Sequence, residues 1–288
     1  MVGYISEKIS SKELFFKFVK ADLEVEVTEI IHNCFMDNSN DWLAFGDNWS
    51  NYSVIGNQSS TAEGALAEKL TNAVDALVVK KCIEVGINPK GPNAPKSFKE
   101  ALQKFWGVED GDPSKLDKET EREILDSLVV MATTKNLKTW KALGANEQEL
   151  ALAVYDDGEG QSPNRLPQTI LSLLKGNKHD IPFTQGNHNQ GGSSTLMHGG
   201  RYSYTLIISK RNVNIVGEFD DMSDDSLHEW GWTLIRQDLR IGESSPVFTY
   251  YAPNGEIPRF AEDELPLLPR IIRGKEAKEY LDYDKSCT

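Results

Sequence analysis

Residues 60–80, STAEGALAEKLTNAVDALVVK, predict a long helix around which the rest of the chain is arranged. Apolar residues recur along it at steps of three and four, which is typical of a helix packed on a sheet; they are Leu66, Leu70, Ala73, Val74 and Leu77. Ser60 and Glu63 form a capping-box pattern that starts the helix, and Gly86 is suited to end it.

A second line of residues on this helix is polar. Glu68, Asn72 and Asp75 are spaced i, i+4 and i+7, so they point to one side and carry two carboxylates and an amide. Such a line is usually a solvated face, and a functional interpretation therefore needs other motifs.

The first such motif follows a short apolar strand at residues 150–155. Asp156, Gly158 and Gly160 form the pattern DxGxG directly after it. The carboxylate could accept a hydrogen bond from an exocyclic amine, and the glycines would leave backbone open to a flat ring. An ordinary turn is the alternative for this pattern alone.

The second motif is the glycine-rich, polar segment at residues 177–200. Its residues Gly191, Gly192, Ser193 and Ser194 precede an expected helix start, where free N–H groups attract anions. A surface loop is the alternative.

Composition restricts the function classes. The chain has 288 residues and a net charge of −13, so we expect no direct binding to nucleic acid. Apolar runs are too short to cross a bilayer, and the first residues have no signal-peptide core. Three widely spaced cysteines indicate a reducing cytoplasm without disulfides, and the histidines form no zinc pattern with them.

The remaining elements are predicted from local patterns. We expect two short helices within residues 12–35, an extended segment at 42–55, and a short helix at 168–175. Residues 87–148 form an expected helical insertion, with one helix at 97–105 and another that places Ile124, Leu125, Leu128 and Met131 on one face. Strands are predicted at 201–209, 213–219, 230–236 and 247–251, with a hairpin turn at 210–212 and an acidic surface loop at 220–225.

The order and spacing of the three motifs resemble the GHKL superfamily, which includes gyrase-type topoisomerases, MutL, the large heat-shock chaperone ATPase, histidine kinases and MORC ATPases. Glu68, Asn72, Asp75 and Ala76 match its N box, and Asp156, Gly158 and Gly160 match its adenine box. The resemblance covers about residues 50–82 and 148–236, and residues 189–199 look nearest to MORC. It implies an α+β fold, the Bergerat two-layer sandwich, with a mixed, mostly antiparallel sheet covered by helices on one face. Residues 1–252 would form this domain, and 253–288 would extend it without folding independently.

The resemblance also implies roles. Glu68 would act as general base, Asn72 would hold Mg²⁺ between the phosphates of ATP, and Asp156 would receive the adenine amine. Gly158 and Gly160 would floor the base pocket, and Asp75 would belong to the same nucleotide site. Gly191, Gly192, Ser193 and Ser194 would bind phosphates, and Lys175 and Lys178 would reach them from the edge of the loop.

The chain departs from the family in three places. Asn189 replaces a glycine of the second glycine box, and about eighty residues separate the first two boxes. We also expect no lysine-bearing second domain after the sheet. The insertion or the tail would then bind a partner protein or a second copy.

We expect an ATPase whose cycle drives conformational change or dimerisation, compatible with bacterial genome maintenance or antiphage defence. A histidine-kinase-type domain and a nucleotide-binding scaffold without turnover are the alternatives. Glu68 favours hydrolysis over both.

Overall fold

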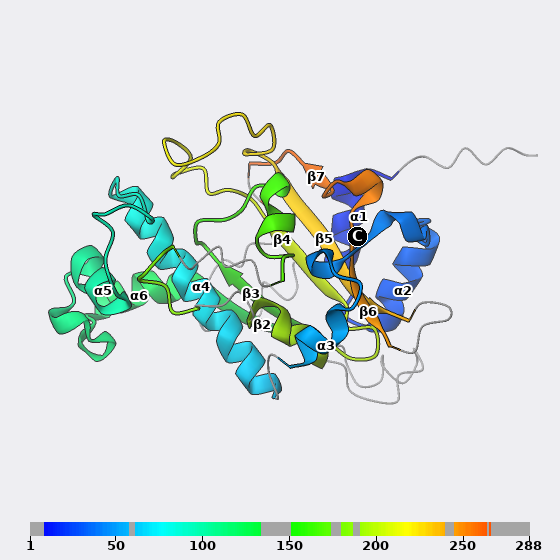
Figure 1. The fold of residues 1–288 in the computed structure, drawn as a ribbon, viewed down its shortest axis with the longest axis horizontal. Coiled ribbons are helices and arrows are strands. Elements are labelled where there is room, and N and C mark those ends of the chain that lie inside the picture. Colours follow the sequence, from blue (N-terminus) through cyan, green and yellow to red (C-terminus); the bar gives the residue numbers. More distant parts are fainter. Residues whose placement is uncertain are drawn as a thin grey trace, which may run out of the picture.

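The centre of the molecule is an antiparallel sheet in the order β1, β6, β5, β4, with β7 paired to β5 (Figure 1). The strands are β1 (Trp42–Ala44), β4 (Thr205–Ser209), β5 (Trp230–Asp238), β6 (Val247–Tyr251) and β7 (Arg259–Phe260). This computed structural model describes residues 9–57, 61–133, 151–173, 180–186, 191–239, 245–263 and 265. The fold is mixed α and β, as the sequence predicts.

Side chains alternate along these strands and build a core on each face of the sheet. On one face, Trp232 and Leu234 pack with helices α1 (Ser11–Val19) and α2 (Glu24–Asn33). On the other face, Ile235 and Phe248 pack with α3 (Asn51–Gly56) and with the 3₁₀ segments η5 (Pro163–Gln168) and η6 (Thr195–His198). The prediction of helices on one face alone is therefore wrong, because both faces of every long strand carry apolar side chains.

Helix α4 (Ala62–Glu84) is the long helix predicted from the sequence. Its N-cap is Thr61, one residue later than predicted, and the Thr61 hydroxyl accepts the N–H of Gly64 at 3.1 Å. Ser60 lies outside the described residues. Gly86 follows the helix with φ of +75°, and its N–H donates to Ile83 at 2.8 Å, which is the expected glycine ending.

The apolar residues of α4 do not form a single stripe. Ala73 and Leu77 are buried as predicted, whereas Leu66, Leu70 and Val74 are only half-buried. The most buried apolar residues of the helix are instead Ala65, Val78 and Cys82. This follows because α4 contacts β3 (Ala151–Asp156), α5 (Phe98–Trp106) and α8 (Gly191–Ser194), so it is packed on several sides.

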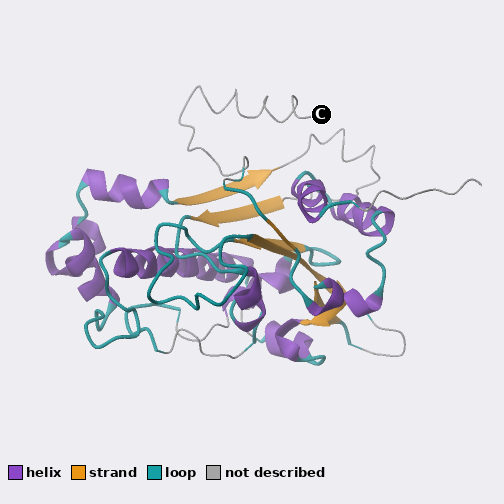
Figure 2. Ribbon diagram, turned by 90° about the horizontal axis from the view of Figure 1, so that it is seen from above, coloured by secondary structure: helices purple, strands orange, loops and turns teal. Residues whose placement is uncertain are grey.

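The insertion is not helical throughout. Helix α5 starts at its Ser97 cap as predicted, and α6 (Lys118–Asp126) follows. Strand β2 (Leu128–Thr133) then pairs antiparallel with β3, where a continued helix is predicted. Val129, Val130 and Thr133 are β-branched and favour a strand, and a short apolar run does not separate the two outcomes by its period. Figure 2 shows α4 alongside this two-stranded sheet.

Three further local predictions are wrong. Residues 45–55 of the segment predicted to be extended contain a 3₁₀ turn and α3, because only Trp42–Ala44 pairs with β6. Residues 213–219 are a loop, shaped by Asp220, whose carboxylate accepts the N–H of Gly217 at 3.1 Å. Residues 169–173 are not helical, because the hydroxyls of Thr169 and Ser172 bond to nearby carbonyls and compete with a helix.

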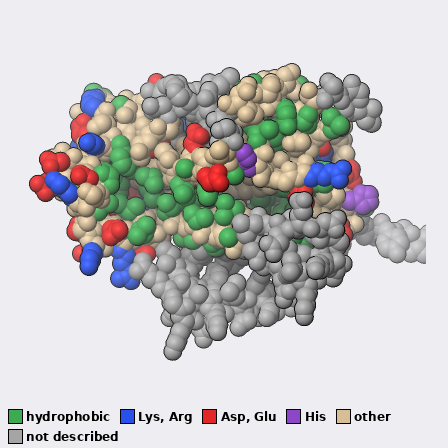
Figure 3. Space-filling view, turned by 90° about the horizontal axis from the view of Figure 1, so that it is seen from below, with side chains coloured by type: hydrophobic (Ala, Val, Ile, Leu, Met, Phe, Trp, Pro, Cys, Tyr) green, Lys and Arg blue, Asp and Glu red, His purple; other side chains and the backbone are tan. Residues whose placement is uncertain are grey.

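The surface seen from below carries a broad gathering of hydrophobic side chains over the half with α4, α5 and α6 (Figure 3). On the β2–β3 pair, Val130 and Leu152 lie on one face and are 46% and 48% exposed. Among the described residues, no helix is long and apolar enough to cross a membrane.

Candidate functional site

The site predicted from the sequence is assembled where α4 meets the turn after β3. A Cβ added to Gly158 would lie 2.5 Å from the Cβ of Ala76, so helix and turn approach as closely as a glycine permits. One turn further along α4, Nζ of Lys80 lies 2.8 Å from Oδ2 of Asp157. Two motifs that are distant in sequence, ExxxNxxDA and DxGxG, are therefore in direct contact.

The glycines of the turn are required by contacts within the protein. Gly160 has φ of +61°, and a Cβ at this position would overlap the carbonyl oxygen of Lys210. The turn itself begins with Asp156, whose Oδ1 accepts the N–H of Gly158 at 3.0 Å. The sequence predicts that these glycines leave room for a flat ring, whereas Ala76 and Lys210 fill the space beside them.

The polar line of α4 is divided between two environments. Asp75 is fully buried, and its two oxygens accept the N–H groups of Gln185 and Gly186 at 2.8 and 2.9 Å. It thus joins α4 to the segment 180–186. Glu68 and Asn72 are half-buried nearer the start of the helix. Asp75 has a structural role in this conformation, and its nucleotide role stays a prediction.

The glycine-rich motif also reaches α4. Gly191, Gly192, Ser193 and Ser194 form the short helix α8, which contacts α4. These four residues are helical themselves, and the side chains of Ser193 and Ser194 are buried. The predicted phosphate ligands Lys175 and Lys178 lie outside the described residues.

Lys69, on α4 beside Glu68, has a pKa well below its ordinary value. Burial lowers its pKa to about 8 from an ordinary 10.5, and the neighbouring Glu68 carboxylate opposes part of that shift. At the end of β3, burial raises the pKa of Tyr155 to about 12, with further contributions from Asp157 and Asp156. The phenol therefore stays protonated at neutral pH.

The donor set fits Mg²⁺ only as a partner of phosphates. Among the described residues, no group of three His, Cys, Asp or Glu side chains could hold a metal ion. Mg²⁺ prefers oxygen ligands and keeps several waters, so a single amide oxygen from Asn72 suits an ion that takes its other ligands from phosphates and water.

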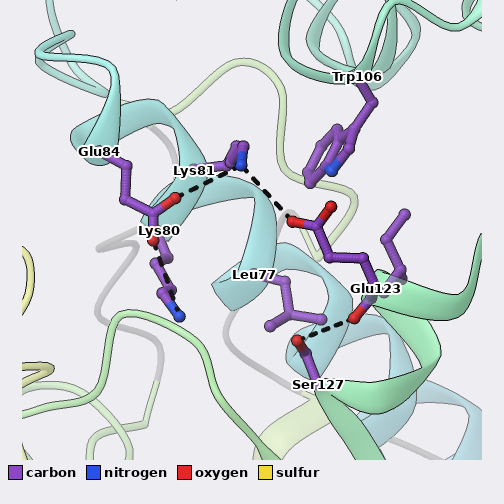
Figure 4. A pocket seen from close by; sticks show the side chains of 8 residues that line it. Leu77, Lys80, Lys81, Glu84, Trp106, Glu123 and Ser127 are labelled. Atoms are coloured by element: carbon purple, nitrogen blue, oxygen red, sulfur yellow. Dashed lines mark hydrogen bonds and ion pairs between the residues drawn. The ribbon is translucent and has the colours of Figure 1, made fainter. Parts of the chain in front are cut away.

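A small pocket lies elsewhere, between α4, α5 and α6 (Figure 4). Lys81 bridges Glu84 and Glu123 across it at 3.7 and 3.6 Å, so its charges are balanced. Leu77 lines the pocket, and nine residues at 100° each place Leu77 opposite Glu68 on the helix. This pocket therefore faces away from Glu68, although its lining shares Lys80 with the turn after β3.

Sequence reasoning missed the residues that hold the turn, chiefly Lys80, Asp157 and Asn212. Nδ2 of Asn212 donates to Oδ1 of Asp157 at 3.2 Å and to the carbonyl of Gly158 at 3.1 Å. Lys80 could have been found, since it follows Ala76 by one turn on the same side of α4. Asn212 carries no local signal of this contact.

Comparisons with known proteins add no relative: no family model, curated protein or solved structure matches the chain.

Proposed function

We propose that this protein binds ATP with Mg²⁺ and hydrolyses it, and that its fold is of the GHKL type. The observation that carries the proposal is the contact between α4 and the turn after β3, with Ala76 against Gly158. It brings the helix with Glu68 and Asn72 next to the strand end with Asp156. The contact of α8 with the same helix adds the third motif.

The proposed roles follow from the chemistry of the side chains. Asp156 accepts the exocyclic amine of adenine, and the fixed turn orients its carboxylate. Asn72 would hold Mg²⁺ through its amide oxygen, and the ion would supply positive charge against the phosphates. Glu68 accepts a proton from water as the water oxygen attacks the γ-phosphorus, the bond from that phosphorus to the bridging oxygen breaks, and ADP leaves.

Calorimetry with Mg·ATP tests the adenine site. Asp156→Ala should weaken binding by at least about tenfold, because the adenine amine would be buried without an acceptor. Asp221→Ala is the matched control, since Asp221 is an exposed aspartate in the 220–225 loop. Unchanged ATP affinity in Asp156→Ala would exclude this assignment.

Phosphate release separates binding from chemistry. Glu68→Gln should bind ATP with nearly normal affinity and hydrolyse it roughly a hundredfold more slowly. Glu63→Gln is the control, because Glu63 is exposed on the first turn of the same helix. Equal turnover in Glu68→Gln and wild type would rule out Glu68 as the base, and ATP binding without release by wild type would favour a scaffold.

A further inference from the structure

Residues 209–212 are the end of β4 and the three residues after it. They form hydrogen bonds and close contacts with the turn of residues 157–161. Each of these four residues contributes. The N–H of Gln161 donates to the Ser209 hydroxyl at 2.8 Å, and Gly160 lies against the carbonyl of Lys210. The Arg211 guanidinium and the Asn212 N–H donate to the carbonyl of Glu159 at 2.9 and 3.0 Å. The position of this turn is therefore set by a segment distant in sequence.

Asn212 has a central place in this contact. Its side chain donates to the carbonyl of Gly158 at 3.1 Å, while the N–H of Gly158 donates to Asp156 at 3.0 Å. Gly158 is thus held from both ends. Asn212 and Lys80 also bind the two different oxygens of Asp157. Asn212, Gly158 and Asp156 are thus connected by consecutive hydrogen bonds.

Arg211 differs from Asn212 because it belongs to a buried ion pair. Its side chain is 8% exposed and forms an ion pair with Asp220 at 2.8 Å, whose side chain is 2% exposed. Removing one member of a buried pair leaves an uncompensated charge, so Arg211 variants would report mainly on folding. Asn212 is half-buried and neutral, and it can be changed without that penalty.

We propose that Asn212 is a positioning residue for base recognition: it fixes the turn through Gly158 and Asp157, and so sets the preference for adenine. The inference rests on the proposed function. Hydrogen bonds weaken steeply with distance and angle, so a small displacement of Asp156 should reduce discrimination between an amine and a carbonyl on the base.

The test compares Mg·ATP with Mg·ITP, whose base has a carbonyl oxygen where adenine has its amine. Dissociation constants are measured by calorimetry for wild type, Asn212→Ala and Asn214→Ala, an exposed asparagine two residues further on. Wild type and Asn214→Ala should prefer ATP by about tenfold or more. Asn212→Ala should lose most of that preference, through weaker ATP binding, with ITP affinity nearly unchanged.

A merely structural role would weaken both nucleotides together, so equal losses, or an unchanged ratio, would overturn the inference. If Asn212→Ala does not fold, Asn212→Ser replaces it, because the Ser hydroxyl can accept the N–H of Asn214, as Oδ1 of Asn212 does at 3.1 Å, and Ser lacks the Nδ2 donor and adds no charge. If Asp156→Ala loses the preference for ATP over ITP and both Asn212 variants keep it, the inference about Asn212 is overturned and the proposed function is not. A wild type that binds neither nucleotide would overturn the proposed function as well.

Discussion

Lys69 shows how one residue can lower stability at neutral pH. Its folded pKa of about 8 lies below the ordinary 10.5, because burial disfavours the charged ammonium. Below pH 8 both states carry the charge, and the folded state bears the full desolvation cost. Between pH 8 and 10.5 the unfolded state binds more protons, so stability should rise with pH through this window.

Lys69→Met should therefore be more stable than wild type at pH 7, by about 1–3 kcal/mol after discounting for partial exposure of the side chain. Urea denaturation at pH 7, 8, 9 and 10 measures the difference, which should shrink above pH 8. Lys99→Met, at an exposed position of α5, is the control. A pH-independent difference between Lys69→Met and wild type would contradict the depressed pKa.

Alanine substitutions at Gly160 and Gly86 distinguish the stability cost of backbone strain from that of steric overlap. Both have positive φ, +61° and +75°, but a Cβ at Gly160 overlaps Lys210, and nothing lies within 4 Å of one at Gly86. Gly86→Ala should cost about 1 kcal/mol from strain alone. Gly160→Ala should cost roughly 1–3 kcal/mol more. If Gly86→Ala and Gly160→Ala lose the same unfolding free energy, the turn around Gly160 must move to accommodate the methyl group.

At the scale of elements, Asp75 couples α4 to the segment 180–186. Asp75→Asn replaces one acceptor oxygen with a donor, which would face the N–H of Gln185 or Gly186. A buried donor left without a partner costs about 1–3 kcal/mol. Amide hydrogen exchange at Gln185 and Gly186 should accelerate, while the amides of β5 keep their protection. Unchanged exchange at both residues would show that the segment is held in another way.

The elements also show what the sequence could predict. The period and capping pattern of α4 are local, so its existence and its glycine ending were predicted, with an error of one residue at the cap. Strand β2 was missed because LVVMAT fits a buried helix as well as a strand. The hydrogen bond from Asn212 to Gly158 could not be predicted from the sequence. It depends on where β4 ends relative to β3, and no local sequence pattern indicates that position.

At the scale of the whole molecule, the two sheets meet at the candidate site. Strands β3 and β4 are not paired with each other, and β3 belongs to the separate sheet with β2. The chain segments that leave their C-terminal ends are nevertheless bonded, through Gln161 to Ser209 and Asn212 to Glu159. The turn that would hold the base is therefore also a junction between the sheets, so its geometry depends on how both are packed.

Phosphoryl transfer needs a source of positive charge near the transferred phosphate. Several described cations near the turn and the sheet are already engaged. Lys80 pairs with Asp157 at 2.8 Å, and Lys210 donates to the carbonyl of Glu262 at 2.8 Å. Arg236 lies 3.7 Å from the ring centre of Trp42 and pairs with Asp238 at 2.8 Å, so it is a poor candidate for the γ-phosphate.

Charge that develops on the phosphoryl group must be neutralised in the transition state, and engagement of Lys80, Lys210 and Arg236 elsewhere would slow the chemical step. We therefore predict that the purified chain binds ATP but releases phosphate at less than about one per second. Arg236→Gln should leave this rate unchanged, since its guanidinium is committed to Trp42 and Asp238. Faster turnover by wild type would place the cation within the chain, and Lys175→Ala and Lys178→Ala would then identify it by a selective loss of rate with ATP affinity retained. Activation of a slow wild type by a partner protein would place the cation in that partner.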